Sequence, residues 1–259
     1  MSNIALTIKR QMTPTYRRLR IAYTSVAARF TGERRAGKLF VIYGRGRSGS
    51  TLFVDLLNNH PDVFCDHEVL STPKPLRSPR DYILDRARLP RCSVYGFKLL
   101  SYQLAALQNI DDESGFLDWL EAEGFEIIYL YRRDILRHAV SNVMARENRE
   151  FHRKKDRGSR VLELQPELLE QWMRGSLNGL EKERAVLQGR RYVSVCYEDD
   201  LEQDKQPTMD RVFTHLGLEP VPVRTQLRKI VTPDLSDTIA NYAELKAHFR
   251  GTDFETYFV

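Results

Sequence analysis

The sequence predicts a three-layer α/β fold, in which helices flank a central, mainly parallel sheet of about four or five strands. Short apolar or β-branched runs alternate along the chain with longer segments whose apolar residues recur at helical spacing. These runs are almost continuously apolar, as strands covered on both faces must be. Parallel strands joined by crossover helices are therefore expected.

The elements follow from these patterns in chain order. Strands are expected at 39–43, 93–97, 126–131 and 192–197. Helices are expected at 51–59, 135–146, 162–187, 208–216 and 239–249. The stretch 71–91 contains four prolines and many charges. We expect it to form a long loop on the ligand side of the sheet, functional or mobile rather than part of the core.

Composition limits the class of protein. The chain has 259 residues and 42% hydrophobic content, enough to bury the core of a single α/β domain. Its net charge of +5 suits an anionic ligand but is too small to indicate nucleic acid. Three cysteines without a CxxC pair favour a reducing compartment over a disulfide framework. No apolar run is long enough to span a bilayer and no secretory signal is seen, so a cytoplasmic protein is expected.

An Arg-rich segment begins the chain. We divide the sequence into a basic N-terminal helical segment, 1–36, and a domain at 37–259. Apolar residues are interleaved with arginines between positions 9 and 35, which leaves two interpretations. In the first, which we favour because exposed arginines are ordinary, the helix packs on the edge of the domain and its charges are solvated. Alternatively, it lies on anionic headgroups at the inner membrane face.

A glycine-rich turn joins the first expected strand to the first expected helix. Positions 43–53 read YGRGRSGSTLF, and Gly44 to Thr51 fit G-x-x-x-x-G-S-T. This is the P-loop pattern except that Ser50 stands where nucleotidases carry Lys. Backbone N–H groups of such a turn and the positive end of the following helix favour an anion. Arg47 can add a planar guanidinium.

Basic residues also end two other expected strands. Lys98 closes the second strand, and Arg132 with Arg133 follows the third. The carboxyl ends of parallel strands meet at one edge, so these cations converge on the turn. We treat Arg132 as a surface charge and leave it outside the site. The missing Lys argues against a triphosphatase, and no metal is expected.

These residues resemble the sulfotransferases that use 3′-phosphoadenosine 5′-phosphosulfate (PAPS). The turn is similar to their 5′-phosphosulfate loop, which the resemblance assigns to Arg47, Ser48, Gly49, Ser50 and Thr51. The segment YRRDILRHAVS is similar to their 3′-phosphate motif, which implies that Arg133 and Ser141 bind that phosphate. A weaker match, VCYEDD, would place Tyr197 near adenine or, equally, in the core.

Within that family the chain looks most like bacterial carbohydrate sulfotransferases of the nodulation-factor and trehalose types. The trehalose type uses a Glu located 17 residues after the last Thr of the loop, which here is Glu68. The resemblance therefore implies Glu68 as the general base, with His67 as a competing base. Lys98 would steady the sulfuryl oxygens, and Arg47 would stabilise the leaving phosphate.

The sequence thus predicts an enzyme of the EC 2.8.2 class that moves a sulfuryl group from PAPS to a hydroxyl of a carbohydrate or glycolipid without metal. A P-loop small-molecule kinase and a non-catalytic nucleotide-binding module remain as alternatives, and a homodimer is left open. Outside the site, Arg45 fits the motif less well than Arg47. We expect Arg137 and His138 to be solvated or interfacial.

Overall fold

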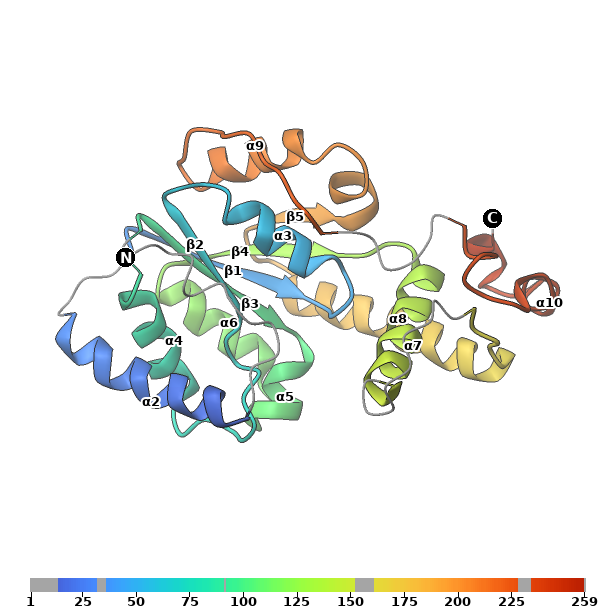
Figure 1. The fold of residues 1–259 in the computed structure, drawn as a ribbon, viewed down its shortest axis with the longest axis horizontal. Helices are drawn as coiled ribbons and strands as arrows, with labels where there is room; N and C mark the ends of the chain where they lie inside the picture. The colour runs from blue at the N-terminus through green and yellow to red at the C-terminus, as the bar shows by residue number, and fades with distance from the viewer. Residues whose placement is uncertain (1–13, 32–35, 91, 152–160, 228–233, 259) are drawn as a thin grey trace.

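The computed structural model describes residues 14–31, 36–90, 92–151, 161–227 and 234–258 of the chain. Five parallel strands form one sheet in the order β2-β3-β1-β4-β5. Figure 1 shows this sheet between layers of helices. The predicted three-layer α/β fold is confirmed. The strands are β1 (Lys38–Gly44), β2 (Val63–Glu68), β3 (Val94–Leu100), β4 (Phe125–Tyr131) and β5 (Tyr192–Cys196).

Residue alternation along the strands divides the core into two halves. Phe40 and Ile42 of β1 face α3 (Ser50–Leu57) and α9 (Gln206–His215), which cover one side of the sheet. Val41 and Tyr43 face the other side and belong to the half of the core to which the remaining α-helices contribute. These are α2 (Pro14–Phe30), α4 (Pro79–Arg88), α5 (Tyr102–Gln108), α6 (Glu113–Ala122), α7 (Ile135–Phe151), α8 (Pro166–Leu187) and α10 (Tyr242–His248).

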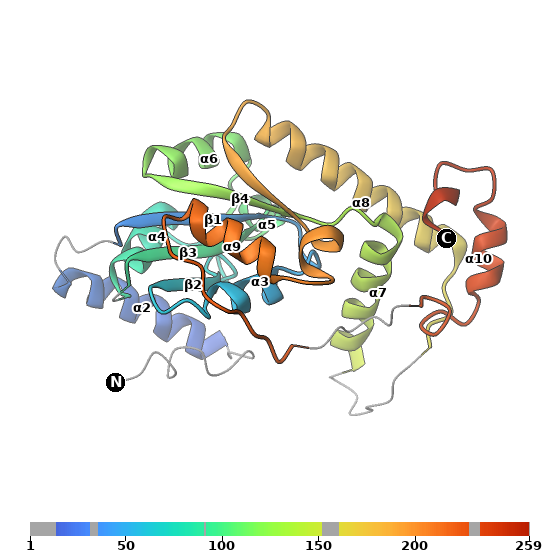
Figure 2. The same ribbon diagram turned by 90° about the horizontal axis from the view of Figure 1, so that it is seen from above.

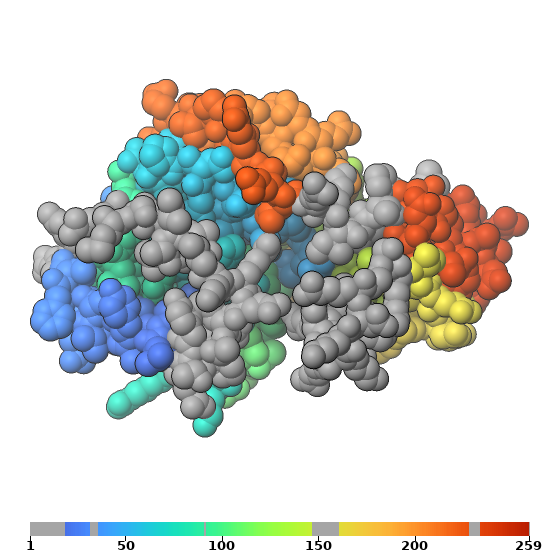
Figure 3. All heavy atoms as spheres, viewed as in Figure 1, coloured from blue at the N-terminus to red at the C-terminus, as the bar shows by residue number. Residues whose placement is uncertain are grey.

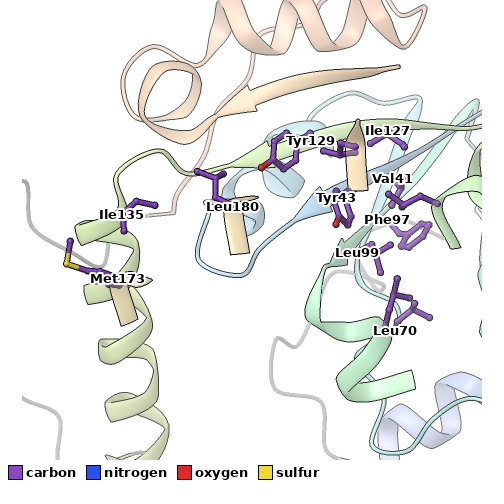
Figure 4. Close-up of a cluster of buried hydrophobic side chains, with 14 of the residues drawn as sticks. Val41, Tyr43, Leu70, Phe97, Leu99, Ile127, Tyr129, Ile135, Met173 and Leu180 are labelled. Atoms are coloured by element: carbon purple, nitrogen blue, oxygen red, sulfur yellow. The ribbon is translucent and has the colours of Figure 1, made fainter. Parts of the chain in front are cut away.

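The half of the core that contains Val41 and Tyr43 extends from the sheet toward α7 and α8. Figure 4 shows Val41, Phe97 and Ile127 on neighbouring strands, while Ile135 and Met173 lie among the helices beyond the strand ends. Figure 2 shows α7, α8 and α10 grouped at that end of the sheet. Since β1 and β4 also end there, the helices wall the edge at which the glycine-rich loop emerges.

The strand β2 was not predicted. Its sequence is VFCDHE, whose polar second half hides the strand pattern. Asp66 is nevertheless buried, and Arg86 donates to its carboxylate through Nε at 2.8 Å. This pairing compensates a buried carboxylate that would otherwise be costly. An edge strand with a buried ion pair therefore looks like a polar loop in the sequence.

The expectation of a mobile, non-core loop at 71–91 is wrong for much of its length. Ser78 caps α4 by accepting from the Asp81 amide, and Pro79 occupies the first turn, where no N–H is needed. Tyr82 and Ile83 of this helix are buried in the core. The prolines thus mark a helix start. Residue 91 lies outside the described residues.

Candidate functional site

The glycine-rich loop between β1 and α3 has a conformation that depends on its glycines. Gly44 and Gly49 have φ of 154° and 80°, and Arg47 has φ 66°, in the left-handed region. A Cβ at Gly44 would overlap the Leu130 carbonyl, and a Cβ at Gly49 would overlap the Tyr197 ring. The neighbouring strand β4 and the segment after β5 therefore lie directly against the loop backbone.

Ser48 is the buried polar residue of the loop. Its side chain is fully buried, and its Oγ has no hydrogen-bond partner within the described residues. A buried hydroxyl without a partner costs free energy, because it has lost its water without replacement. The hydroxyl can donate to an anion held by the loop, next to the start of α3.

Arg47 joins the two motifs that the sequence analysis separated. Its Nε donates to Ser141 Oγ at 3.0 Å, and Ser141 is buried on α7. The predicted 5′-phosphate loop and the predicted 3′-phosphate helix thus contact each other. Several donors for anionic oxygens lie within one small region, as expected for a ligand with two phosphate groups.

Arg132 contributes to this region, and the expectation that it is only a surface charge is wrong. It is buried, and its Nε lies 3.1 Å from Glu198 Oε1. Its guanidinium carbon lies 4.8 Å from the centre of the Tyr197 ring. Both partners of Arg132, the aromatic ring and the carboxylate, come from the VCYEDD segment. A pairing between segments this distant cannot be read from either one alone.

Arg133 has a different environment. It is exposed, and both terminal nitrogens donate to the Asp199 carboxylate, at 2.6 and 2.8 Å. These hydrogen bonds and the charge of Asp199 raise the pKa of Arg133, while the same hydrogen bonds and the charge of Arg133 lower the pKa of Asp199. Solvent screens such an exposed pair, so its net contribution to stability is small. The guanidinium is thus held at the protein surface by two hydrogen bonds, and an incoming anion can replace Asp199 as their acceptor.

Glu68 and Lys98 form the second predicted group. The register of β2 against β3 sets them side by side, and Lys98 Nζ lies 2.8 Å from Glu68 Oε1. Gln103 Nε2 donates to the other carboxylate oxygen at 3.2 Å. Lys98 is buried, whereas the Glu68 side chain is about one-third exposed. The pair joins a buried cation to a carboxylate that solvent or a substrate can reach.

A register irregularity in β2 separates the two candidate bases. The ladder shifts between Asp66 and Glu68, so the residue paired with β3 after Asp66 is Glu68, which lies opposite Lys98. His67 is exposed at this position. Glu68, by contrast, stays in the ladder beside Lys98. The local strand geometry therefore places Glu68, rather than His67, next to the buried cation.

His138 supports the loop from α7, and the expectation that it is solvated or interfacial is wrong. Its Nε2 donates to the Gly46 carbonyl at 2.8 Å, so its Nδ1 accepts from Ser176 Oγ at 2.8 Å. Burial lowers the pKa of His138 to about 3, and the charge of nearby Arg45 acts in the same direction. The neutral ring fixes the loop backbone to α8.

Arg45 extends the same support beneath the loop. It is buried, and its Nε lies 3.3 Å from Glu183 Oε2 on α8. Tyr129 and Ser101 hydroxyls donate to the same carboxylate, at 3.1 and 3.2 Å. Burial raises the pKa of Glu183 to about 7, while Arg45 and these hydroxyls partly offset that effect. Arg45 thus anchors the loop from behind and does not face a ligand.

No metal cluster accompanies the site in the described ranges: no three His, Cys, Asp or Glu side chains come close enough to hold an ion. Metal-free chemistry remains a prediction. Across the same residues, no helix is both long and apolar enough to cross a bilayer.

The parallel sheet and the glycine-rich loop between β1 and α3 define an α/β protein with a P-loop-like fold. No family model matches the chain. It is similar to nodulation protein H of Rhizobium meliloti strain 1021, with 25% identity over 234 residues, covering 85% of this chain and 94% of that protein. A second nodulation protein H, from Rhizobium meliloti, matches with the same identity and coverage. These matches confirm the resemblance to the nodulation-factor type predicted from the motifs.

Three solved structures are also similar to this chain. A sulfotransferase from Alicyclobacillus acidocaldarius has 15% identity and a TM-score of 0.48, covering 86% of this chain and 99% of that one. A mouse sulfotransferase complexed with PAP has 13% identity and a TM-score of 0.47, covering 88% and 89%. A sulfotransferase from Mycobacterium avium has 13% identity and a TM-score of 0.49, covering 91% and 81%.

Proposed function

We propose that this protein transfers the sulfuryl group of PAPS to a hydroxyl of a carbohydrate or glycolipid. The observation that carries the proposal is the contact between Arg47 and Ser141, at 3.0 Å. The resemblance assigns these residues to the two phosphates of a single nucleotide, although they lie far apart in the sequence. The similarity to two nodulation proteins over most of the chain supports the same assignment.

The donor nucleotide fits the groups present at the loop. Ser48 offers a buried hydroxyl that lacks a partner in the described part of the chain. Backbone N–H groups at the start of α3 and the guanidinium of Arg47 supply further donors for the 5′-phosphate. Ser141 and Arg133 would hold the 3′-phosphate, which replaces Asp199 as the partner of Arg133. Tyr197 and Arg132 would line the nucleotide side of the loop.

The transfer step is an in-line displacement at sulfur. The acceptor oxygen forms a bond to sulfur while the bond between sulfur and the 5′-phosphate oxygen breaks, and that oxygen keeps the electron pair. Glu68 takes the acceptor proton, and 3′-phosphoadenosine 5′-phosphate (PAP) leaves with its charge held by Arg47. Lys98, which lies 2.8 Å from Glu68, stabilises the sulfuryl oxygens.

A P-loop kinase is disfavoured by two observations. Ser50 stands where a kinase of this class carries Lys, and the two carboxylates in the second half of β2 are paired with cations, Asp66 with Arg86 and Glu68 with Lys98. A kinase would need a free carboxylate and Mg²⁺ near the loop. A non-catalytic nucleotide-binding module would bind the donor but show no transfer.

Replacing Glu68 tests the proposed base. Glu68→Gln keeps an oxygen to accept from Lys98 but cannot take a proton, so kcat should fall by about 10² to 10⁴. Affinity for PAP should remain within about twofold, because the amide leaves the phosphate donors in place. Radiolabelled PAPS with a panel of sugar and glycolipid acceptors measures kcat, and calorimetry measures PAP affinity.

The matched control is His67→Ala, one residue away on the exposed side of the strand, which should keep near-normal turnover. Transfer that survives in Glu68→Gln but is lost in His67→Ala would make His67 the base. Wild-type protein that binds PAP without transferring sulfuryl to any acceptor would favour the binding module. Activity that requires Mg²⁺ and ATP would favour the kinase.

A further inference from the structure

The N-terminal helix α2 exposes four large apolar residues to solvent. Leu19, Tyr23, Val26 and Phe30 are 65%, 66%, 55% and 85% exposed. Their spacing of four, three and four residues puts all four on one stripe of the helix. Single exposed apolar residues are ordinary, whereas a continuous stripe of large ones indicates an interaction site.

The opposite face of α2 attaches the helix to the domain. Thr24 and Ala28 are buried, and Ile21 packs against the core. Arg20 Nε lies 3.5 Å from the hydroxyl of Tyr82 on α4, and α2 runs beside α4 in both ribbon views. At 100° per residue, the attached face and the apolar stripe point in nearly opposite directions. The helix thus packs on the domain edge, and its most apolar side faces outward.

Charge identifies the kind of partner. The helix sequence PTYRRLRIAYTSVAARF contains four arginines and no acidic residue. Two copies of this helix packed through their stripes would bring like charges together without any carboxylate to offset them. A bilayer with anionic headgroups satisfies both features, since it accepts large apolar side chains and attracts the arginines.

We propose that the stripe of Leu19, Tyr23, Val26 and Phe30 docks this protein on the surface of an anionic lipid bilayer. The helix lies in the plane of the surface, with the stripe in the upper acyl region and the exposed Arg29 at the level of the headgroups. Figure 3 shows α2, coloured blue, on the outer surface of the molecule. This proposal concerns attachment, and it does not depend on the proposed sulfuryl transfer.

The test uses the full chain and vesicles of two compositions. Flotation with vesicles of phosphatidylcholine and phosphatidylglycerol in equal parts should retain the protein at low salt and release it as salt rises. Vesicles of phosphatidylcholine alone should retain much less. The variant Leu19→Gln/Val26→Gln/Phe30→Gln should lose at least about tenfold in partitioning, because three large apolar groups no longer enter the bilayer.

The matched control replaces three exposed apolar residues on other parts of the molecule: Val161→Gln/Leu168→Gln/Leu227→Gln. This control should float like the wild type. Equal losses in both triple variants, or equal binding to the two vesicle compositions, would overturn the proposal. If the stripe variant unfolds in thermal melts, the single variant Phe30→Gln replaces it, because Phe30 is the most exposed residue of the stripe. Unchanged flotation of that single variant would also overturn the proposal.

Sedimentation without lipid tests whether a second copy of the chain, rather than a bilayer, covers the stripe. A dimer that is present in the wild type and absent in the stripe variant would show that a second copy covers the stripe. A monomer in both, together with salt-sensitive flotation of the wild type only, supports the bilayer. Since none of these measurements uses an acceptor or PAPS, a protein without transferase activity would still test the attachment.

Discussion

At the scale of single residues, the glycine-rich loop places two glycines in very different surroundings. Gly49 has a positive φ and lies against the Tyr197 ring, which occupies the space of a Cβ. Gly46 has Leu100 Cδ1 at 3.8 Å from where a Cβ would stand, which is an ordinary contact. The same substitution at these two positions should therefore have opposite outcomes.

Gly49→Ala should abolish detectable PAP binding, because both the left-handed backbone and the ring contact would have to change. The matched variant Gly46→Ala should bind PAP within about threefold of the wild type, because its side chain meets only ordinary contacts. Calorimetry on both variants, after a thermal melt confirms folding, measures the difference. Equal affinities would mean that the loop conformation does not control binding.

At the scale of elements, α8 holds a titrating group under the loop. Glu183 has a pKa raised by burial from its usual 4.5 to about 7. Between these values the unfolded chain releases the proton while the folded protein keeps it. The contribution of this group to stability is thus complete below pH 4.5, falls as pH rises, and is lost above about pH 7.

Glu183→Gln should remove this pH dependence. The free energy of unfolding of the wild type minus that of the variant should fall by about 3 kcal/mol between pH 4.5 and 7 and stay constant above. Urea melts of both proteins at several pH values give the difference. A difference that stays flat over this range would show that Glu183 is already ionised in the folded protein, as its pair with Arg45 favours.

The sequence predicted those elements whose patterns are local. The runs that became β1, β3 and β4 are mostly apolar, with one charged residue in each strand, so their strands were found within a few residues. β2 was missed because its polar half is buried through the Asp66–Arg86 pair, which the chain forms only after folding, and α4 was missed because the prolines around it indicate a loop. α5 and α6 were also missed, and for α5 seven residues are too short for periodicity to register.

The same distinction holds for the site. The loop and Lys98 were predicted from their own segments, and the structure sets Lys98 beside Glu68. The roles of Arg132 and His138 depend on partners in other elements, Tyr197 for the first and Gly46 with Ser176 for the second. Charge and polarity along the chain suggested solvent for both residues, whereas the fold supplies protein partners.

At the scale of the whole molecule, nucleotide binding should appear as a gain in stability. PAP at a hundredfold excess over its Kd should raise the free energy of unfolding by about 2.7 kcal/mol, and EDTA should not alter this gain. AMP should bind more weakly than PAP by about 1.5 to 3 kcal/mol, because it lacks the 3′-phosphate. Thermal melts and calorimetry measure both effects.

Arg133→Gln should reduce the preference for PAP over AMP to within about threefold, since it removes the cation that we propose as the main partner of the 3′-phosphate. Arg174→Gln is the matched control, because Arg174 also forms an exposed ion pair, with Glu170 on α8. The control should keep the full preference. A preference that persists in Arg133→Gln would assign the 3′-phosphate to other residues.

The sheet order has a consequence for synthesis on the ribosome. The central strand β1 emerges before its partners, because Lys38 pairs with Val94 on one side and Leu39 with Phe125 on the other. Until β4 leaves the exit tunnel, one side of β1 has nothing to bond, and Leu130 is not yet present to press on Gly44. The nascent chain therefore carries its glycine-rich loop early but can shape it only after roughly half of the protein has been made.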